Sequence, residues 1–401
     1  MTYELQITIP NLFKQQNRLN PTQEKALKYY SGDNLYPFIN RITRGKLKPT
    51  NKQTTKTTKI NKYNFTPEEY DRFLNIAIDT LEILEEIFES PLASLYVLPR
   101  RTALYRSIDK KYQKNFINDD VLYSTYQDNA YTSTTINLNV ARVFKDVDAF
   151  KTKLYLLPGI PYNMAIVDSL SASVKEQEVL LNKNCVYFYI GKVEINNETI
   201  KSTILHEFIL LPNMEVYKQI SRPVLESLGR KIHQEYEDIL RSVNIFQERN
   251  KDTFRMGFTK YKYISELEYL MQVIITKPKP LPDPIWGVTI YTYFEVNALK
   301  LQRLLFMGLT DLISLHTVFI DGTAEVYLLR KHLDNIQWIL YLMKIQKLDI
   351  QRYIKAIKLP SIDTREKLQS YLRNELLKDK KLLEEKLIEI QNKGGRRLRA
   401  N

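Results

Sequence analysis

Three groups of polar residues, each on a strand-like segment, are the best candidates for chemistry in this chain. The first contains Arg106, the second is Ser133-Thr134-Thr135, and the third is the pair Glu176 and Glu178. An arginine guanidinium offers a planar fork of donors that suits phosphate. If the third segment is extended, both carboxylates point to the same face, because side chains alternate along a strand. The residues therefore suggest phosphate binding beside a pair of carboxylates.

Each group also has a purely structural explanation when it is taken alone. Arg106 would form a surface salt bridge, and Ser133-Thr134-Thr135 would reflect the high β propensity of threonine. The glutamate pair would lie at a solvated strand edge. The apolar run Val179-Leu180-Leu181 that follows the pair argues against a solvated edge. A buried strand with two carboxylates at its mouth is costly unless the carboxylates are used.

In this order and spacing, the three groups resemble the NAD-dependent mono-ADP-ribosyltransferases of the arginine–serine–glutamate type, including toxin-like members with a Glu-x-Glu motif. The resemblance implies that Arg106, in Leu104-Tyr105-Arg106-Ser107, contacts NAD. It also implies that Ser133 orients the catalytic glutamate. Thr135 stands where the family has a second serine and keeps the hydroxyl. The residues that the resemblance places against NAD are Tyr105, Arg106, Ser133, Thr134, Thr135 and Phe144.

Phe144 is the least distinctive of these residues, because a phenylalanine is often a core residue. By the resemblance, Glu178 holds a ribose hydroxyl and stabilises the cationic ribose that forms when the nicotinamide bond breaks. Glu176 guides or deprotonates the acceptor, and glutamate at that position is typical of members that modify arginine. The implied catalytic residues are Arg106, Ser133, Glu176 and Glu178, with NAD as substrate and no metal.

The implied activity is therefore transfer of ADP-ribose from NAD to a target protein, with arginine as the expected acceptor. Two alternatives stay open. Water could be the acceptor, which would make the protein an NAD glycohydrolase. The fold could also be catalytically inactive and serve as a basic interaction protein or nucleic-acid-binding protein.

The composition suits an ordinary protein with a sizeable core, since 44% of the 401 residues are hydrophobic and 26% are charged. The net charge of +13 leaves nucleic acid, an anionic membrane or an acidic protein open as partners. No compact arginine-rich recognition helix stands out, which favours lysine-biased coding as the source of the charge. We therefore expect NAD and a target protein, rather than nucleic acid, as partners.

The cysteine and histidine content gives no support for disulfides or a metal site. Cys185 is the only cysteine, so no intrachain disulfide is expected, and the four histidines show no metal-ligand spacing. The first residues lack the pattern of a signal peptide. No apolar run approaches the roughly 18 residues needed to span a bilayer. These features predict a soluble, cytoplasmic protein, in the virion or host cell if the source is viral.

The order of helical and strand patterns predicts an α+β fold. Helices are expected from Pro21, around Leu35 to Ile42, and from Pro67, where Thr66 and Glu69 form a capping box. Strands are then expected at Thr102–Ile108, Ala130–Thr135, Lys153–Leu157, Asn163–Val167, Glu178–Leu181, Val186–Ile195 and Thr203–Leu211. The predicted class is an ADP-ribosyltransferase-like domain, with N-terminal helices and two packed, mostly antiparallel sheets, followed by a mainly α-helical C-terminal domain.

The predicted domain boundaries follow these patterns. Residues 1–19 form an extension and residues 20–213 the transferase-like domain, which contains a flexible basic insertion at about 44–63. Residues 214–245 are a connecting helix. Residues 246–401 form a helical domain of unknown role. In this last part, a long amphipathic helix is expected from about Asp363 to Gln391, stopped by Gly394-Gly395.

Overall fold

The structure of the protein is a computed structural model. It describes residues 19–31, 35–47, 58–60, 63–98, 101–117, 121–135, 149–167, 178–197, 200–234, 323–357 and 361–397. Two of the predicted site residues, Phe144 and Glu176, lie outside the described residues.

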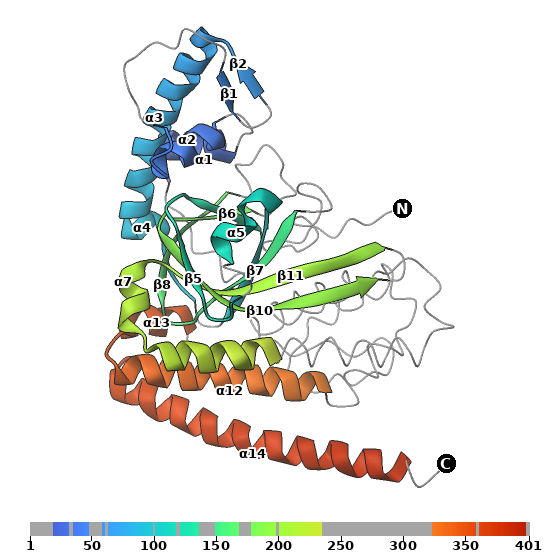
Figure 1. Cartoon of the computed structure of the whole chain (residues 1–401). Coiled ribbons are helices and arrows are strands. Elements are labelled where there is room, and N and C mark those ends of the chain that lie inside the picture. The colour runs from blue at the N-terminus through green and yellow to red at the C-terminus, as the bar shows by residue number, and fades with distance from the viewer. Residues whose placement is uncertain are drawn as a thin grey trace, which may run out of the picture.

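Three N-terminal helices form a cap on one side of the sheet (Figure 1). They are α1 (Pro21–Ser31), α2 (Tyr36–Thr43) and α3 (Pro67–Glu89). The predicted capping box starts α3: Thr66 Oγ1 accepts from Glu69 N at 3.2 Å, and a Glu69 carboxylate oxygen accepts from Thr66 N at 2.9 Å. The apolar side chains of these helices pack on the sheet residues Tyr131, Ala165 and Leu180.

The predicted basic insertion is structured at both of its described ends. Strands β1 (Thr58–Ile60) and β2 (Tyr63–Phe65) pair antiparallel, where the sequence predicted a flexible loop. Phe65 explains the difference, because its buried ring contacts Phe38 of α2 at 5.2 Å between centroids. An aromatic anchor of this kind orders the strand that carries it. At the other end, Arg44 forms an ion pair with the buried Asp128 at 2.9 Å.

A nine-stranded mixed sheet carries the predicted site. Its strand order is β3-β8-β9-β6-β4-β7-β11-β10-β5. The bounds are β3 (Leu95–Val97), β4 (Thr102–Ile108), β5 (Thr125–Asp128), β6 (Thr132–Thr135), β7 (Phe150–Leu156), β8 (Pro161–Ile166), β9 (Glu178–Leu181), β10 (Cys185–Asn197) and β11 (Ile200–Leu211). Short helices α4 (Pro91–Ser94), η2 (Lys110–Tyr112) and α5 (Gln113–Phe116) lie between strands in the sequence. Each of the seven predicted strands corresponds to an observed one.

The sheet consists of two halves that meet at a single residue pair. In β3-β8-β9-β6 every neighbouring pair is antiparallel, and in β4-β7-β11-β10-β5 only β7 and β11 are parallel. The halves are joined where Tyr105 of β4 pairs with Thr135 of β6. The prediction of two packed, mostly antiparallel sheets is confirmed, with the addition that one residue pair connects them.

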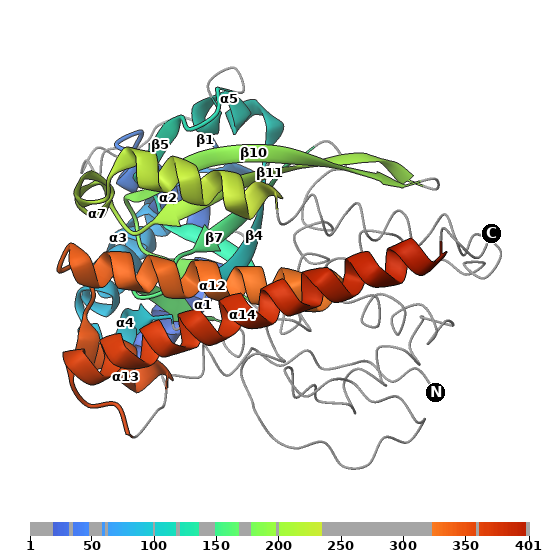
Figure 2. The same cartoon turned by 90° about the horizontal axis from the view of Figure 1, so that it is seen from below.

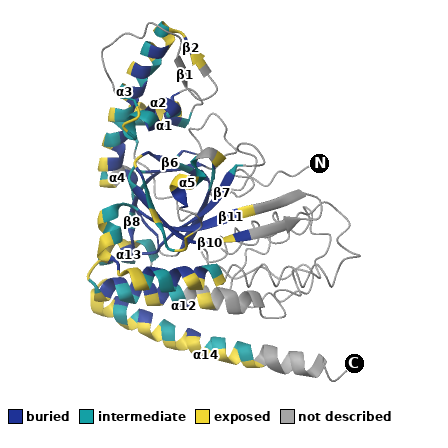
Figure 3. Ribbon diagram, in the orientation of Figure 1, coloured by how far each residue is buried: buried dark blue, intermediate teal, exposed yellow. Residues whose placement is uncertain are grey.

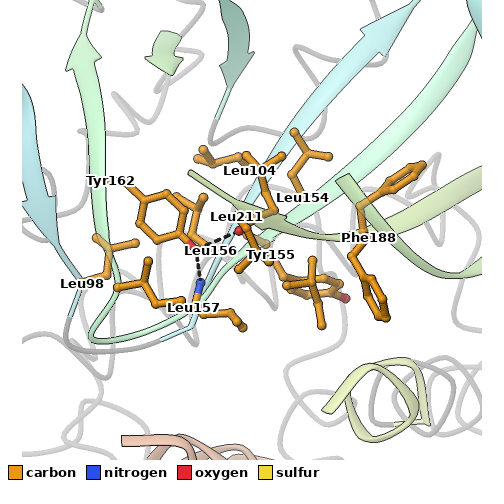
Figure 4. Packing of buried hydrophobic residues seen from close by; sticks show 14 of the residues in the cluster. Leu98, Leu104, Leu154, Tyr155, Leu156, Leu157, Tyr162, Phe188 and Leu211 are labelled. Carbon is orange, nitrogen blue, oxygen red and sulfur yellow. Dashed lines mark hydrogen bonds between the residues drawn. The ribbon is translucent and has the colours of Figure 1, made fainter. Parts of the chain in front are cut away.

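The two halves pack against each other through a buried apolar layer (Figures 3 and 4). Tyr162 of the first half reaches the second half with its hydroxyl. That hydroxyl donates to the Leu210 carbonyl at 2.8 Å and accepts from Leu157 N at 2.9 Å. Since Tyr162 is almost fully buried, these hydrogen bonds satisfy its polar tip and fix the spacing of the halves.

C-terminal helices cover the other side of the sheet, opposite the N-terminal cap (Figures 1 and 2). They are α12 (Thr323–Lys344), α13 (Ile350–Ile357) and α14 (Arg365–Arg397). The long helix was predicted to stop at Gly394-Gly395, but α14 continues to Arg397. Each interior glycine costs a helix only about 1 kcal/mol, which is too little to force a stop. None of the helices in the described ranges is both long and apolar enough to cross a membrane.

The predicted connecting helix is divided in two within its described part. Helix α7 (Met214–Gln219) is capped by Asn213, whose side chain accepts from Val216 N at 2.8 Å, and a second helix covers residues 222–234. Pro223 explains the break, because a proline has no N–H to continue the hydrogen bonds of α7 and its ring would clash with the carbonyl four residues earlier, whereas the first turn of a new helix tolerates it. The second helix lies beside α12, to which Lys231 is joined by an ion pair with Asp334 at 2.6 Å.

The turn between β7 and β8 is seated against α12 and the segment that follows it. Trp338 of α12 donates its indole N–H to the Pro158 carbonyl at 2.9 Å. Gly159 adopts a φ of +75°, and a Cβ atom at this position would lie 2.6 Å from Leu348 Cδ1 and 2.7 Å from Ile339 Cδ1. The C-terminal helices and the sheet thus share one hydrophobic core. The domain boundaries within residues 214–401 stay a prediction.

Replacing Gly159 with alanine should destabilise the protein by about 3 kcal/mol, since it combines left-handed strain with overpacking against α12. Gly45→Ala is the matched control, because Gly45 also has a positive φ, of +66°, with nothing within 4 Å of an added Cβ. The control should cost about 1 kcal/mol. Denaturant unfolding of both variants measures the difference. Equal losses would show that α12 does not pack on this turn in solution.

Candidate active site

The site lies where the two halves of the sheet separate. Strands β4 and β6 pair at Tyr105 and Thr135. Arg106 follows Tyr105 on β4, and Thr132 lies three residues before Thr135 on β6, so these two residues stand on opposite sides of the split. The Arg106 guanidinium spans the split. Its Nη1 donates to Tyr187 Oη at 3.0 Å and to Thr132 Oγ1 at 3.5 Å. The Arg106 side chain is 14% exposed, so it is hydrogen-bonded to groups inside the protein and still reaches solvent.

A buried carboxylate, Asp128 of β5, ties two arginines together. Arg44, which follows α2, binds it through two contacts, Nε to Oδ1 at 3.0 Å and Nη2 to Oδ2 at 2.9 Å. Arg106 Nη1 lies 3.6 Å from the same Oδ2, and Ala130 N donates to Oδ1 at 3.1 Å. Two guanidinium groups against one carboxylate leave a net positive charge, which suits an anion such as a diphosphate.

Sequence reasoning missed Arg44 and Asp128. Arg44 stands at the start of a basic interval that was interpreted as a flexible insertion, and Asp128 was one of many acidic residues. No local pattern distinguishes them. Their role appears only when β5, next to β10 at the sheet edge, comes close to the end of α2.

Arg106 keeps its charge in this setting. Burial acts to lower the pKa of Arg106, but the neighbouring Tyr187 and Asp128 outweigh burial and raise the pKa further above its ordinary value. The predicted explanation of Arg106 as a surface salt bridge does not fit, since Asp128 is fully buried and Arg106 is mostly so. Arg106 therefore presents a permanent cation at the split.

Ser133 and Glu178 come together on neighbouring strands of the first half. Glu178 pairs with Thr135 across the β6–β9 ladder, and Ser133 Oγ donates to Glu178 Oε1 at 2.5 Å. Glu178 is only 6% exposed, and its backbone carbonyl accepts from Val167 N at 3.0 Å. The carboxylate is thus held at a defined place by one short hydrogen bond and by the strand itself.

The other predicted residues take different positions. Thr134 points to the face opposite Ser133, and its hydroxyl donates to the Val179 carbonyl at 2.6 Å. Tyr105 and Thr135 are buried and form the pair that joins the two halves. The structure therefore brings Ser133, Thr135 and Glu178 together on one face and places Arg106 at the split, in contact with Thr132 of the same strand β6.

Tyr30 of α1 relates the two charged residues to each other. Its buried hydroxyl lies 3.2 Å from Asn40 Oδ1 and 3.3 Å from the Tyr131 carbonyl, which are the acceptors within its reach. Burial raises the pKa of Tyr30 strongly; the Arg106 charge acts to lower that pKa and the Glu178 charge acts to raise it. Arg106 and Glu178 therefore act in opposite directions on the pKa of one buried hydroxyl group.

Chemically, the site combines a cation for an anionic ligand with an oriented carboxylate for a developing positive charge. Within the described part of the chain, no group of three or more His, Cys, Asp or Glu side chains is placed to hold a metal ion.

Comparisons with known proteins add the following. No family model matches the chain, and no curated protein matches it either. Among solved structures it is similar to Plx2a, an ADP-ribosyltransferase toxin from Paenibacillus larvae, with 14% identity over 49% of this chain and 90% of that chain, at a TM-score of 0.34. It is also similar to C3stau2 from S. aureus with NAD, with 16% identity over 50% and 92% of the two chains, at a TM-score of 0.33. A third is the enzymatic component C2-I of the C2 toxin from Clostridium botulinum, with 17% identity over 51% and 45%, at a TM-score of 0.34.

Replacing Arg44 with glutamine should lower the free energy of unfolding by about 3 kcal/mol, because it leaves the buried Asp128 without its closest counter-charge. Chemical denaturation measures this loss. Adding Asp128→Asn to the same chain should recover part of it, since a neutral side chain needs no cation. Lys367→Gln is the control: its partner Asp363 is well exposed, so stability should hardly change. Equal effects of the two single variants would contradict the buried pair.

Proposed function

We propose that the protein is an NAD-dependent protein mono-ADP-ribosyltransferase. The observation that carries the proposal is the hydrogen bond between Ser133 and Glu178, on the strand β6 whose Thr132 contacts the Arg106 cation. The same three residue types, in the same chain order, underlie the resemblance to the arginine–serine–glutamate transferases. β propensity alone does not account for a tertiary contact between residues 45 positions apart, where the resemblance requires it.

The reaction breaks the bond between the nicotinamide nitrogen and C1′ of the ribose. The bonding electron pair leaves with nicotinamide, so its nitrogen loses the positive charge while positive charge builds on the ribose. Glu178 stabilises that charge, and Ser133 holds the carboxylate in place before the reaction, when reorganisation would otherwise cost energy. Arg106 binds the diphosphate and so fixes C1′ near the carboxylate.

The acceptor completes the reaction by attacking C1′ and losing a proton. In the proposed reaction the acceptor is an arginine side chain of a target protein, and Glu176 receives or directs its proton. The support for arginine is the glutamate at position 176, two residues before Glu178. In an extended segment the two carboxylates share a face, which would place Glu176 near the bound ribose.

Glu178→Gln should reduce NAD cleavage by at least about 100-fold, because it removes the negative charge that stabilises the transition state. Release of nicotinamide from labelled NAD measures the rate. Glu207→Gln is the matched control: Glu207 is also a buried carboxylate, bonded to Tyr155 and His233 at 2.6 Å each, on the other half of the sheet. The control should keep its activity. Full NAD cleavage by folded Glu178→Gln protein would overturn the assignment.

Glu176→Gln should separate the two possible outcomes of NAD cleavage. We expect loss of ADP-ribose transfer to arginine, while slow hydrolysis of NAD continues, because the carboxylate that guides the acceptor is gone but Glu178 remains. Incubation with labelled NAD and a cell lysate gives both products. Equal loss of transfer and hydrolysis would contradict the acceptor role of Glu176. Free ADP-ribose as the only wild-type product would make the protein a glycohydrolase.

A further inference from the structure

The hydroxyl of Tyr187, on β10, joins the two sides of the split. It accepts a hydrogen bond from Arg106 Nη1 at 3.0 Å and lies 3.0 Å from Thr132 Oγ1, a second hydrogen bond. Arg106 Nη1 is also 3.5 Å from the same Thr132 oxygen, so the three groups form a closed triangle. Thr132 begins β6, the strand that carries Ser133. One phenol group thus contacts both the predicted NAD-binding arginine and the strand of the catalytic serine.

The ring that carries this hydroxyl is rigidly held. Tyr187 is fully buried, and its ring meets those of Phe116 at 5.0 Å and Phe208 at 5.7 Å, both edge to face. Burial raises the pKa of Tyr187 well above its ordinary value, although Arg106 acts to lower it. The phenol therefore stays neutral and keeps its proton. It can accept from Arg106 while it hydrogen-bonds Thr132.

We propose that Tyr187 is a positioning residue: its hydroxyl holds the Arg106 guanidinium across the split, in the orientation that binds the diphosphate of NAD. The inference rests on the proposed function and adds a residue that no motif contains. A long arginine side chain has several accessible rotamers, and fixing them costs conformational entropy. Tyr187 removes that cost before the ligand arrives. The Arg106 side chain as a whole is 14% exposed.

Asp128 also contacts Arg106, but Tyr187 gives the cleaner experiment. Replacing Asp128 removes a negative charge beside the site, and this change by itself would strengthen the binding of an anionic ligand. It would therefore mask the weaker binding that results from the lost orientation of Arg106. Tyr187→Phe keeps the ring, the volume and the formal charge, and removes only the hydroxyl. Its effect on NAD binding therefore reports the orientation of Arg106.

The experiment measures kcat and KM for NAD in the full-length chain, by nicotinamide release, together with the thermal unfolding midpoint. We expect Tyr187→Phe to raise KM roughly 10- to 100-fold, the worth of a hydrogen bond to a charged group. The kcat should change little, because diphosphate binding acts on ground state and transition state alike. Thr132→Val, which removes the other hydroxyl of the triangle, should raise KM in the same direction, and the double variant should show less than the product of the single effects.

Tyr162→Phe is the matched control. Tyr162 is equally buried and its hydroxyl also makes two hydrogen bonds, but both go to the backbone of the core, to Leu157 and Leu210. It should lower the unfolding midpoint without changing KM. If the wild type is active and KM is unchanged in both Tyr187→Phe and Thr132→Val, the inference about Tyr187 is overturned while the proposed function stands. A wild type that neither binds nor cleaves NAD would overturn the proposed function and this inference together.

Discussion

The candidate site depends on the pairing of β4 with β6 at one position, Tyr105 opposite Thr135. This pair keeps nine strands in one hydrogen-bonded sheet while the two halves fold toward each other and bury a common apolar layer. A longer ladder between the two strands would close the split that Arg106 now spans. A missing pair would release Glu178, whose strand pairs with β6, from the half that carries Arg106. The single pair thus links the half that carries Glu178 to the half that carries Arg106.

Polar groups inside a split of this kind need hydrogen-bond or ion-pair partners. In this protein the partners come from distant parts of the chain. Arg44 follows α2, Asp128 ends β5 and Tyr187 belongs to β10, yet all three surround Arg106 or its partner. Charges and hydroxyls neutralise or bond one another in a low-dielectric setting, where each unmet group would be costly. The same requirement that stabilises the cluster also orients the guanidinium, so the proposed NAD binding would use the contacts that stabilise the fold.

The C-terminal helices pack on the same sheet from its other side. Trp338 and the residues around Gly159 seat α12 on a turn of the sheet, and the 222–234 helix lies beside α12. The sheet therefore has helical cover on both sides, from α1 to α3 on one and from the C-terminal helices on the other. Strands β4, β7 and β11 are consecutive in the sheet. Movement of β7 or β11 would therefore disturb both the helical cover and β4, the strand that carries Arg106.

The sequence by itself determined the elements and the candidate chemistry. Alternation and turn residues located the seven strands, the capping box located the start of α3, and the Ser133 and Glu178 pair followed from a motif. These features are local, since strand periodicity and helix capping involve residues within a few positions of one another. Gly394-Gly395 and Pro223 show the limit of local rules: the glycines did not end α14, and the proline divided a helix that was predicted to be continuous. Only the tertiary structure decided that Asp128 and Tyr187 meet Arg106, that Arg44 meets Asp128, and that the C-terminal helices share the core of the sheet. Arg44 and Asp128 are 84 positions apart and Arg106 and Tyr187 are 81 apart, and their contacts follow from strand order and packing, which no local pattern encodes.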